Sequence, residues 1–208
     1  IIRLPRAFSF DGHAALQPVG DAPCIENGFV TFGSFNRLNK INREVIALWS
    51  GVLRAVPGSR LQMAGMPANG APEELLQWFA AEGIAEDRLI FYPRSGFSEY
   101  LKLHNQVDFC LDTFPYTGGT TTLHALWMGV PTLTIGGHAY PSYQGALMLH
   151  QVGLEDYFVA NNKEDFIIKA LFLVKNQIFL QDARFKLRNY LVDGYSASLK
   201  AVVDSFSL

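Results

Sequence analysis

The sequence predicts an α/β fold, with a Rossmann-like parallel sheet and helices on both of its faces. From residue 29 to about residue 151, short strand-like apolar segments alternate with segments whose apolar residues recur at helical spacing. Breaks such as Pro57-Gly58 and Gly136-Gly137 separate these segments. Such alternation is typical of parallel sheets built from βαβ units. At 208 residues, 49% hydrophobic and 17% charged, the chain can form one large globular domain.

Each expected element follows from local patterning. Strands are indicated by short runs of β-branched, aromatic and aliphatic residues, such as Phe29-Val30-Thr31-Phe32, and we expect them over residues 29–32, 60–64, 88–91, 107–111 and 131–135. Helices are indicated where apolar residues recur three and four positions apart. Pro57 and Gly83 provide two of the helix stops. We expect helices over residues 45–53, 73–82, 98–104, 120–128 and 143–151.

The pattern divides the chain into three parts. Residues 1–28 contain several prolines and glycines with little periodicity, and we expect an extended lead-in that wraps the domain. Residues 29–160 carry the strand and helix alternation of the Rossmann-like domain. Residues 161–208 have a purely helical pattern and are expected to pack back on that domain.

A phosphate-binding helix start is predicted after the fourth strand. The segment Gly118-Gly119-Thr120-Thr121-Thr122 joins a Pro/Gly-broken loop to the expected helix. Flexible glycines, free backbone N–H groups and threonine hydroxyls at a helix N-terminus suit a phosphate group. The same residues would also serve a helix start that binds nothing, because threonine caps helices and glycine makes turns.

The loop after the first strand supplies the matching positive charge. Lys40 and Arg37 lie in this loop, and loops that follow parallel strands meet at one edge of the sheet. Lys40 could therefore hold a diphosphate from the side opposite the helix start and offset charge on a departing nucleotide. The alternative is a solvated surface lysine.

Composition and spacing exclude several other classes of function. The formal net charge of −2 gives no general attraction to nucleic acid or anionic membranes. No apolar run is long enough to span a bilayer, and Cys24 and Cys110 fit a reducing, cytoplasmic setting. The histidines lack metal-ligand spacing, and no GxSxG hydrolase motif occurs. His124 could reach a ligand or simply pack, and Asp108 and Asp112 could be structural or catalytic.

Several separated motifs resemble one protein family. The chain resembles the C-terminal catalytic lobe of the O-linked N-acetylglucosamine transferase and SPINDLY family of protein glycosyltransferases, from about Leu4 to Leu191. The motifs that carry the resemblance are Phe32–Ile41, Trp49, Val56–Leu61, Leu111–Tyr116, Thr120–Thr122 and Leu126–Pro131.

The resemblance implies one lobe of a two-lobed, GT-B type transferase that is inverting and metal-independent and needs no cofactor. The remaining lobe and tetratricopeptide repeats would come from a longer protein. The donor would be UDP-N-acetylglucosamine first, or GDP-fucose, while a third branch of the family uses UDP-glucose. In this family the diphosphate-binding lysine would be Lys40 and the hydroxyl pair Thr120 and Thr121. Arg37 would lie near the pyrophosphate, and the nucleobase of the donor would lie by Ser95 and Tyr100.

Three functions are consistent with these residues. The first is the donor-binding lobe of a cytoplasmic protein O-glycosyltransferase with a protein or peptide acceptor. The second is a catalytically idle nucleotide-sugar or protein-interaction module. Three departures from the family pattern favour it. The family often has His or Thr where this chain has Gly119, an acidic residue that grips the ribose where it has His124, and Arg where it has Tyr143. The third is a two-lobed transferase that acts on a lipid or a small molecule.

Overall fold

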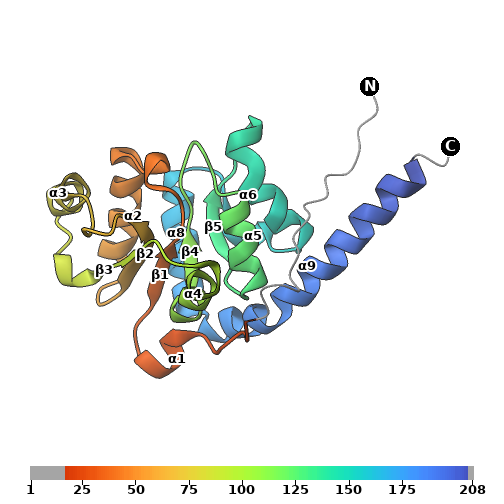
Figure 1. Ribbon diagram of the computed structural model, residues 1–208, viewed down its shortest axis with the longest axis horizontal. Coiled ribbons are helices and arrows are strands. Elements are labelled where there is room, and N and C mark those ends of the chain that lie inside the picture. The colour runs from red at the N-terminus through yellow and green to blue at the C-terminus, as the bar shows by residue number, and fades with distance from the viewer. Residues whose placement is uncertain (1–16, 206–208) are drawn as a thin grey trace.

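The computed structural model describes residues 17–205, with side chains to residue 193. It contains a parallel sheet with helices on both faces (Figure 1), which confirms the predicted fold class. The strands lie in the spatial order β3-β2-β1-β4-β5-β6, which is typical of Rossmann folds. Their bounds are β1 (Thr31–Ser34), β2 (Arg60–Met66), β3 (Leu89–Pro93), β4 (Phe109–Leu111), β5 (Thr132–Ile135) and β6 (Val159–Ala160).

Helices connect the strands and extend the C-terminal part. The α-helices are α1 (Pro23–Asn27), α2 (Arg43–Ala55), α3 (Glu73–Ala81), α4 (Phe97–Leu103), α5 (Thr120–Trp127), α6 (Tyr140–Gln151), α7 (Glu155–Phe158), α8 (Lys163–Lys175) and α9 (Gln177–Ser205). Short 3-10 helices are η2 (Leu38–Lys40), η3 (Glu86–Arg88) and η4 (His104–Gln106). Helix α2 packs against α3 and α8, whereas α5 packs against α6 and α9.

Alternate residues of one strand show that both faces of the sheet are covered. Phe109 and Leu111 of β4 belong to the larger buried core, which also contains Phe166 of α8. Cys110, between them, belongs to a second core that includes Ala125 of α5. Successive side chains of a strand point to opposite faces, so β4 is buried on both sides.

The sequence predicted five of the six strands and the helix after each of them in the right order, with small errors at their ends. Strand β1 begins two residues later than expected, and α6 begins at Tyr140 because Pro141 fits the first turn of a helix. The expectation of a fully extended lead-in was wrong for residues 23–27, which form α1. Residues 1–16 and 206–208 of the predicted terminal segments lie outside the described part. The division at residues 28 and 160 stays a prediction.

Candidate functional site

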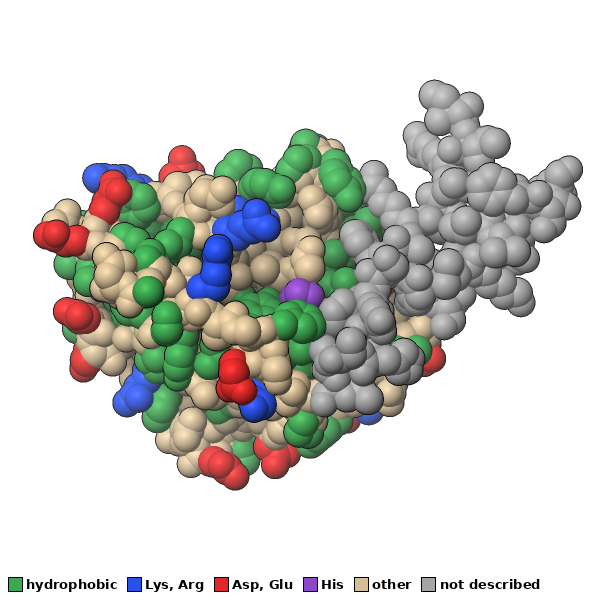
Figure 2. All heavy atoms as spheres, viewed as in Figure 1, with side chains coloured by type: hydrophobic (Ala, Val, Ile, Leu, Met, Phe, Trp, Pro, Cys, Tyr) green, Lys and Arg blue, Asp and Glu red, His purple; other side chains and the backbone are tan. Residues whose placement is uncertain are grey.

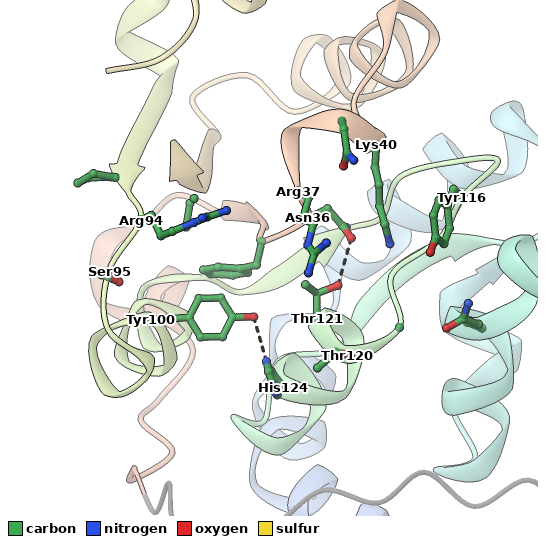
Figure 3. A pocket seen from close by; sticks show the side chains of 17 residues that line it. Asn36, Arg37, Lys40, Arg94, Ser95, Tyr100, Tyr116, Thr120, Thr121 and His124 are labelled. Atoms are coloured by element: carbon green, nitrogen blue, oxygen red, sulfur yellow. Dashed lines mark hydrogen bonds between the residues drawn. The ribbon is translucent and has the colours of Figure 1, made fainter. Parts of the chain in front are cut away.

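A pocket lies at the carboxyl ends of β1 to β4, where the strand order reverses. Strands β1 and β4 are neighbours in the sheet, and the connections that follow them lead away in opposite directions. Ligands of open α/β sheets bind at such a switch point. The pocket has a volume of about 600 Å³. Side chains that line it (Figure 3) include those of Asn36, Arg37, Lys40, Arg94, Ser95, Tyr100, Tyr116, Thr120, Thr121, His124 and Gln144.

The structure brings most of the predicted site residues together. The pocket is lined by Arg37, Lys40, Ser95, Tyr100, Gly119, Thr120, Thr121 and His124. Gly118 is the exception, since it is buried next to the pocket and its N–H donates to Asp112 Oδ1 at 2.8 Å. The roles of these residues in binding or catalysis remain predictions.

Lys40 is held against the loop that follows β4. Its Nζ donates to the carbonyl oxygen of Thr117 at 2.8 Å and lies 4.0 Å from the centroid of the Tyr116 ring. Partial burial lowers the pKa of Lys40, and the nearby Arg37 acts in the same direction, while the Asp112 carboxylate opposes them. The loop from β1 therefore reaches across to the loop from β4.

The N-terminus of α5 forms the facing wall. Thr120 is the first residue of this helix, and the N–H groups of a first helical turn have no partner within the helix. Thr121 Oγ1 lies 3.1 Å from Asn36 Oδ1, so the two walls also touch here. A Cβ at Gly119 would lie 2.5 Å from Gln144 Oε1. A larger residue at this position would therefore require the flexible end of Gln144 to move.

Asp112 joins the elements below the pocket without lining it. Its buried carboxylate accepts hydrogen bonds from the N–H groups of Thr113 and Gly118 and from the hydroxyl of Thr134 on β5. It also contacts the amide of Asn36 at 3.2 Å. Burial raises the pKa of Asp112, which these hydrogen bonds counteract.

Asp108 has a comparable structural position at the other end of β4. Its carboxylate accepts from the N–H groups of Cys24 and Thr31, at 2.9 and 2.8 Å. These bonds attach α1 and the start of β1 to β4, and Asp108 does not line the pocket.

The walls of the pocket differ in charge. Three cations, Arg37, Lys40 and Arg94, line it, and Figure 2 shows Lys and Arg side chains near a histidine on this face. Near Ser95, Tyr100 Oη lies 3.3 Å from Nδ1 of His124. Burial lowers the pKa of His124 to about 4, so this imidazole is neutral at pH 7. The pocket thus combines three cationic side chains with the uncharged pair of Tyr100 and His124.

Nine lining residues were not among the predicted site residues, and Arg94, Asn36, Tyr116 and Gln144 are four of them. Arg94 directly follows β3, so the strand-end rule that indicated Lys40 could have found it. Asn36 and Tyr116 lie within the two motifs already singled out, but no spacing distinguishes them. Gln144 lies on α6 and reaches the pocket only through tertiary packing, for which the sequence carries no signal.

The described part of the chain lacks a metal-binding cluster and a membrane-spanning helix. Between residues 17 and 193, no group of three or more His, Cys, Asp or Glu side chains could hold a metal ion. No described helix is both long and apolar enough to cross a membrane.

The family model for glycosyl transferase family 41 matches residues 23–201. The chain belongs to glycosyl transferase family 41. This confirms the resemblance inferred from the motifs. Over 195 residues it is 35% identical to the probable UDP-N-acetylglucosamine–peptide N-acetylglucosaminyltransferase SPINDLY of Solanum lycopersicum. It is 31% identical over 163 residues to the probable transferase SEC of Arabidopsis thaliana.

These family 41 relatives are much longer than the chain. The match to the tomato protein covers 92% of this chain but 21% of the relative, and the match to SEC covers 78% and 16%. The chain therefore spans about a fifth of the length of the curated relatives it matches.

Solved structures show the same fold. A mutant of the O-GlcNAc transferase of Thermobaculum terrenum has a TM-score of 0.75 and 32% identity, covering 92% of this chain and 38% of that chain. Anabaena HepE in complex with UDP has a TM-score of 0.60 at 15% identity, covering 88% and 51%. The second likeness shows the fold alone. This family 41 chain is thus one lobe of the two-lobed GT-B architecture.

Proposed function

We propose that the chain is the donor-binding lobe of an inverting, metal-independent protein O-glycosyltransferase. The observation that carries this proposal is that two loops, one after β1 and one after β4, line a single pocket. Lys40 and the N-terminus of α5 line the same pocket, at the edge where Rossmann-like sheets bind nucleotides. Such a pair suits a diphosphate with an ammonium on one side and backbone N–H groups on the other.

The proposed reaction is one displacement at the anomeric carbon. A Ser or Thr hydroxyl of the acceptor forms the new C–O bond as the bond to the diphosphate breaks, which inverts the anomeric configuration. The nucleoside diphosphate leaves with the electron pair, and Lys40, Thr120 and the α5 N-terminus stabilise its developing charge. The hydroxyl proton passes to a base that we place outside this chain, in the N-terminal lobe, the substrate or water.

We propose UDP-N-acetylglucosamine as the donor, with GDP-fucose as the alternative. The names of the SPINDLY and SEC relatives, which specify UDP-N-acetylglucosamine, support the first choice. The full-length protein would add an N-terminal lobe and tetratricopeptide repeats, and would work in the cytoplasm. The two described cysteines are buried free thiols, which fits a reducing compartment.

Replacing Lys40 tests the proposal directly. Lys40→Ala removes the ammonium, and UDP or GDP binding should weaken by about 10- to 100-fold, as expected for a lost charged hydrogen bond. Isothermal titration calorimetry on the chain measures this. In the full-length protein, the same change should abolish sugar transfer.

A surface lysine supplies the control. Lys102 on α4 is half-exposed and pairs with Glu99, so Lys102→Ala should leave nucleotide binding unchanged. Equal affinities of Lys40→Ala and the wild-type chain would rule out the assigned role of Lys40.

A catalytically idle nucleotide-sugar module is the second candidate. Two observations favour it: Gln144 occupies the space beside Gly119, and His124 is neutral where relatives of this type often have an acid. Mass spectrometry of peptides incubated with the full-length protein and each nucleotide sugar would separate the two functions. Nucleotide binding without any transfer would favour the idle module.

A further inference from the structure

The hydrogen bonds around α5 distinguish its first two threonines. We propose that Thr120 alone donates its hydroxyl to the diphosphate, whereas the hydroxyl proton of Thr121 is held by Asn36. Asn36 is then a positioning residue, and Asp112 fixes the orientation of its amide. This inference rests on the proposed function, because it concerns the same nucleotide pocket.

Asp112 Oδ1 acts only as a hydrogen-bond acceptor. It receives backbone N–H groups from Thr113 and Gly118, each at 2.8 Å. A backbone N–H group can donate a hydrogen bond but cannot accept one, so the carboxylate oxygen is the acceptor in both bonds. Even a protonated Asp112 would carry its proton on Oδ2, which faces the hydroxyl of Thr134 at 2.8 Å.

The contact with Asp112 determines the orientation of the Asn36 side-chain amide. Because Asp112 Oδ1 accepts, the group that faces it at 3.2 Å must be the NH2 group of Asn36. The carbonyl oxygen of Asn36 then faces Thr121. Asn36 is 6% exposed, so a flipped amide would lose both bonds and regain little from water in the pocket.

The hydroxyl group of Thr121 has a single proton and can donate only one hydrogen bond. The carbonyl oxygen of Asn36 cannot donate, so Thr121 Oγ1 donates to it across 3.1 Å. Thr121 therefore presents only lone pairs to the pocket. Such lone pairs repel a phosphate oxygen but can accept from a sugar hydroxyl or from an ammonium group.

Thr120 is in the opposite situation. Its side chain is exposed and lines the pocket (Figure 3), and no described residue forms a hydrogen bond with its hydroxyl. Its proton is available to a bound anion. The chain Asp112–Asn36–Thr121 meanwhile joins the loop of β1 to α5, so it also sets the distance between the pocket walls.

A double-mutant cycle on UDP and GDP binding tests the assignment. Thr120→Val removes a donor to a charged phosphate and should weaken binding by about 10- to 100-fold. Thr121→Val should act only through Asn36, so its effect should disappear in the Asn36→Ala background. Thr120→Val should keep its full effect in that background. Thr122→Val is the matched control, because the buried Thr122 does not line the pocket.

A charge change at Asn36 gives an independent readout. Asn36→Asp puts two carboxyl groups side by side, and one proton must replace the lost amide hydrogen for the contact with Asp112 to persist. Affinity relative to the wild-type chain should therefore rise at least about tenfold between pH 8 and pH 5. Asn39→Asp adds a carboxyl group at an exposed position of the same loop that also lines the pocket but has no carboxylate beside it, and it should show no such rise.

The outcomes separate this inference from the proposed function. If the wild-type chain binds neither UDP nor GDP, both are overturned. If it binds, but Thr121→Val and Asn36→Ala have additive effects, or Asn36→Asp shows a flat pH ratio, only the positioning role is overturned. Urea unfolding of each variant identifies any loss of binding that reflects loss of the fold.

Discussion

The ammonium of Lys40 lies between the carbonyl oxygen of Thr117, the ring of Tyr116 and the guanidinium of Arg37. Burial and Arg37 lower its pKa from the ordinary lysine value. A lysine is charged below its pKa, so the diphosphate-binding role that we propose for Lys40 would be lost as the pH rises through that value. Because the pKa is lowered, this loss begins at a lower pH than for an exposed lysine.

We therefore predict that alkaline pH weakens nucleotide binding through Lys40. The affinity for UDP or GDP should fall progressively as the pH rises from 7.5 to 10, toward the loss of about tenfold or more that is expected once the charged hydrogen bond is gone. Lys40→Arg should remove most of this fall, since arginine stays charged. Calorimetric titrations at several pH values measure it, and parallel curves for the two proteins would contradict the prediction.

Single site residues could be predicted where chemistry and position agreed. Lys40 and Thr120 follow strands that end at the same edge of the sheet, and each has a side chain suited to phosphate. The sequence left Asp112 open between structural and catalytic roles, because a carboxylate after a strand fits both. Its hydrogen bonds come from residues far apart in the chain, such as Asn36 and Thr134.

Strand β1 depends on the absence of a side chain at Gly33. A Cβ there would lie 2.6 Å from Val107 Cγ1 and 3.0 Å from its Cγ2. Gly33 pairs with Cys110 of β4, so the two strands that flank the pocket meet at this position. The branched side chain of Val107 is fully buried and cannot move away freely.

Gly33→Ala should destabilise the protein by about 1–3 kcal/mol, as overpacking in a core does. Gly51→Ala is the matched control. Its Cβ would meet only the flexible end of Ile167, and alanine favours the helix α2 by about 1 kcal/mol. Urea unfolding measures both variants. A Gly33→Ala midpoint equal to that of the wild-type chain would show that β1 tolerates a methyl group.

It was easier to predict which helices and strands form than to predict the residues at which they begin and end. The helical spacing from Val45 to Leu53 gave α2, and Asn42, whose side chain accepts from the N–H of Val45, marks its start. Helix α7 and strand β6 were missed because four and two residues are too few to show a period. Helix α1 was missed because proline and glycine around it read as extended chain.

Across the whole molecule, Arg184 connects the C-terminal helix to the sheet. It lies on α9, is 1% exposed, and donates to the carbonyl oxygens of Gly20, Val107 and His104 at 2.6, 2.8 and 3.2 Å. These carbonyls belong to the segment before α1 and to the residues around η4 and β4. One side chain thus holds three parts of the chain together.

Arg184→Met should destabilise the protein by about 3 kcal/mol or more, because it leaves several buried carbonyl oxygens without a donor. Lys186→Met, two residues away, is the control. Lys186 is exposed and pairs with Asp182, so its replacement should cause no measurable change. Unchanged urea midpoints for both variants would show that α9 is held by its apolar contacts alone.

The strand order could not be read from the sequence. Alternation predicts parallel strands, but it does not say which strands are neighbours. The placement of β1 between β2 and β4 depends on buried contacts such as the edge-to-face pair of Phe32 and Phe109, whose ring centroids lie 5.0 Å apart. Because β1 lies beside β4, the loop after β1 and the loop after β4 line the same pocket.

Because β1 is paired directly with β4, the sheet has a seam between its two βαβ halves, and the pocket straddles that seam. A nucleotide bound there would brace one half against the other, and its binding energy would add to the free energy of unfolding. If the lobe binds a nucleotide as we propose, its resistance to unfolding would then rise with the nucleotide concentration.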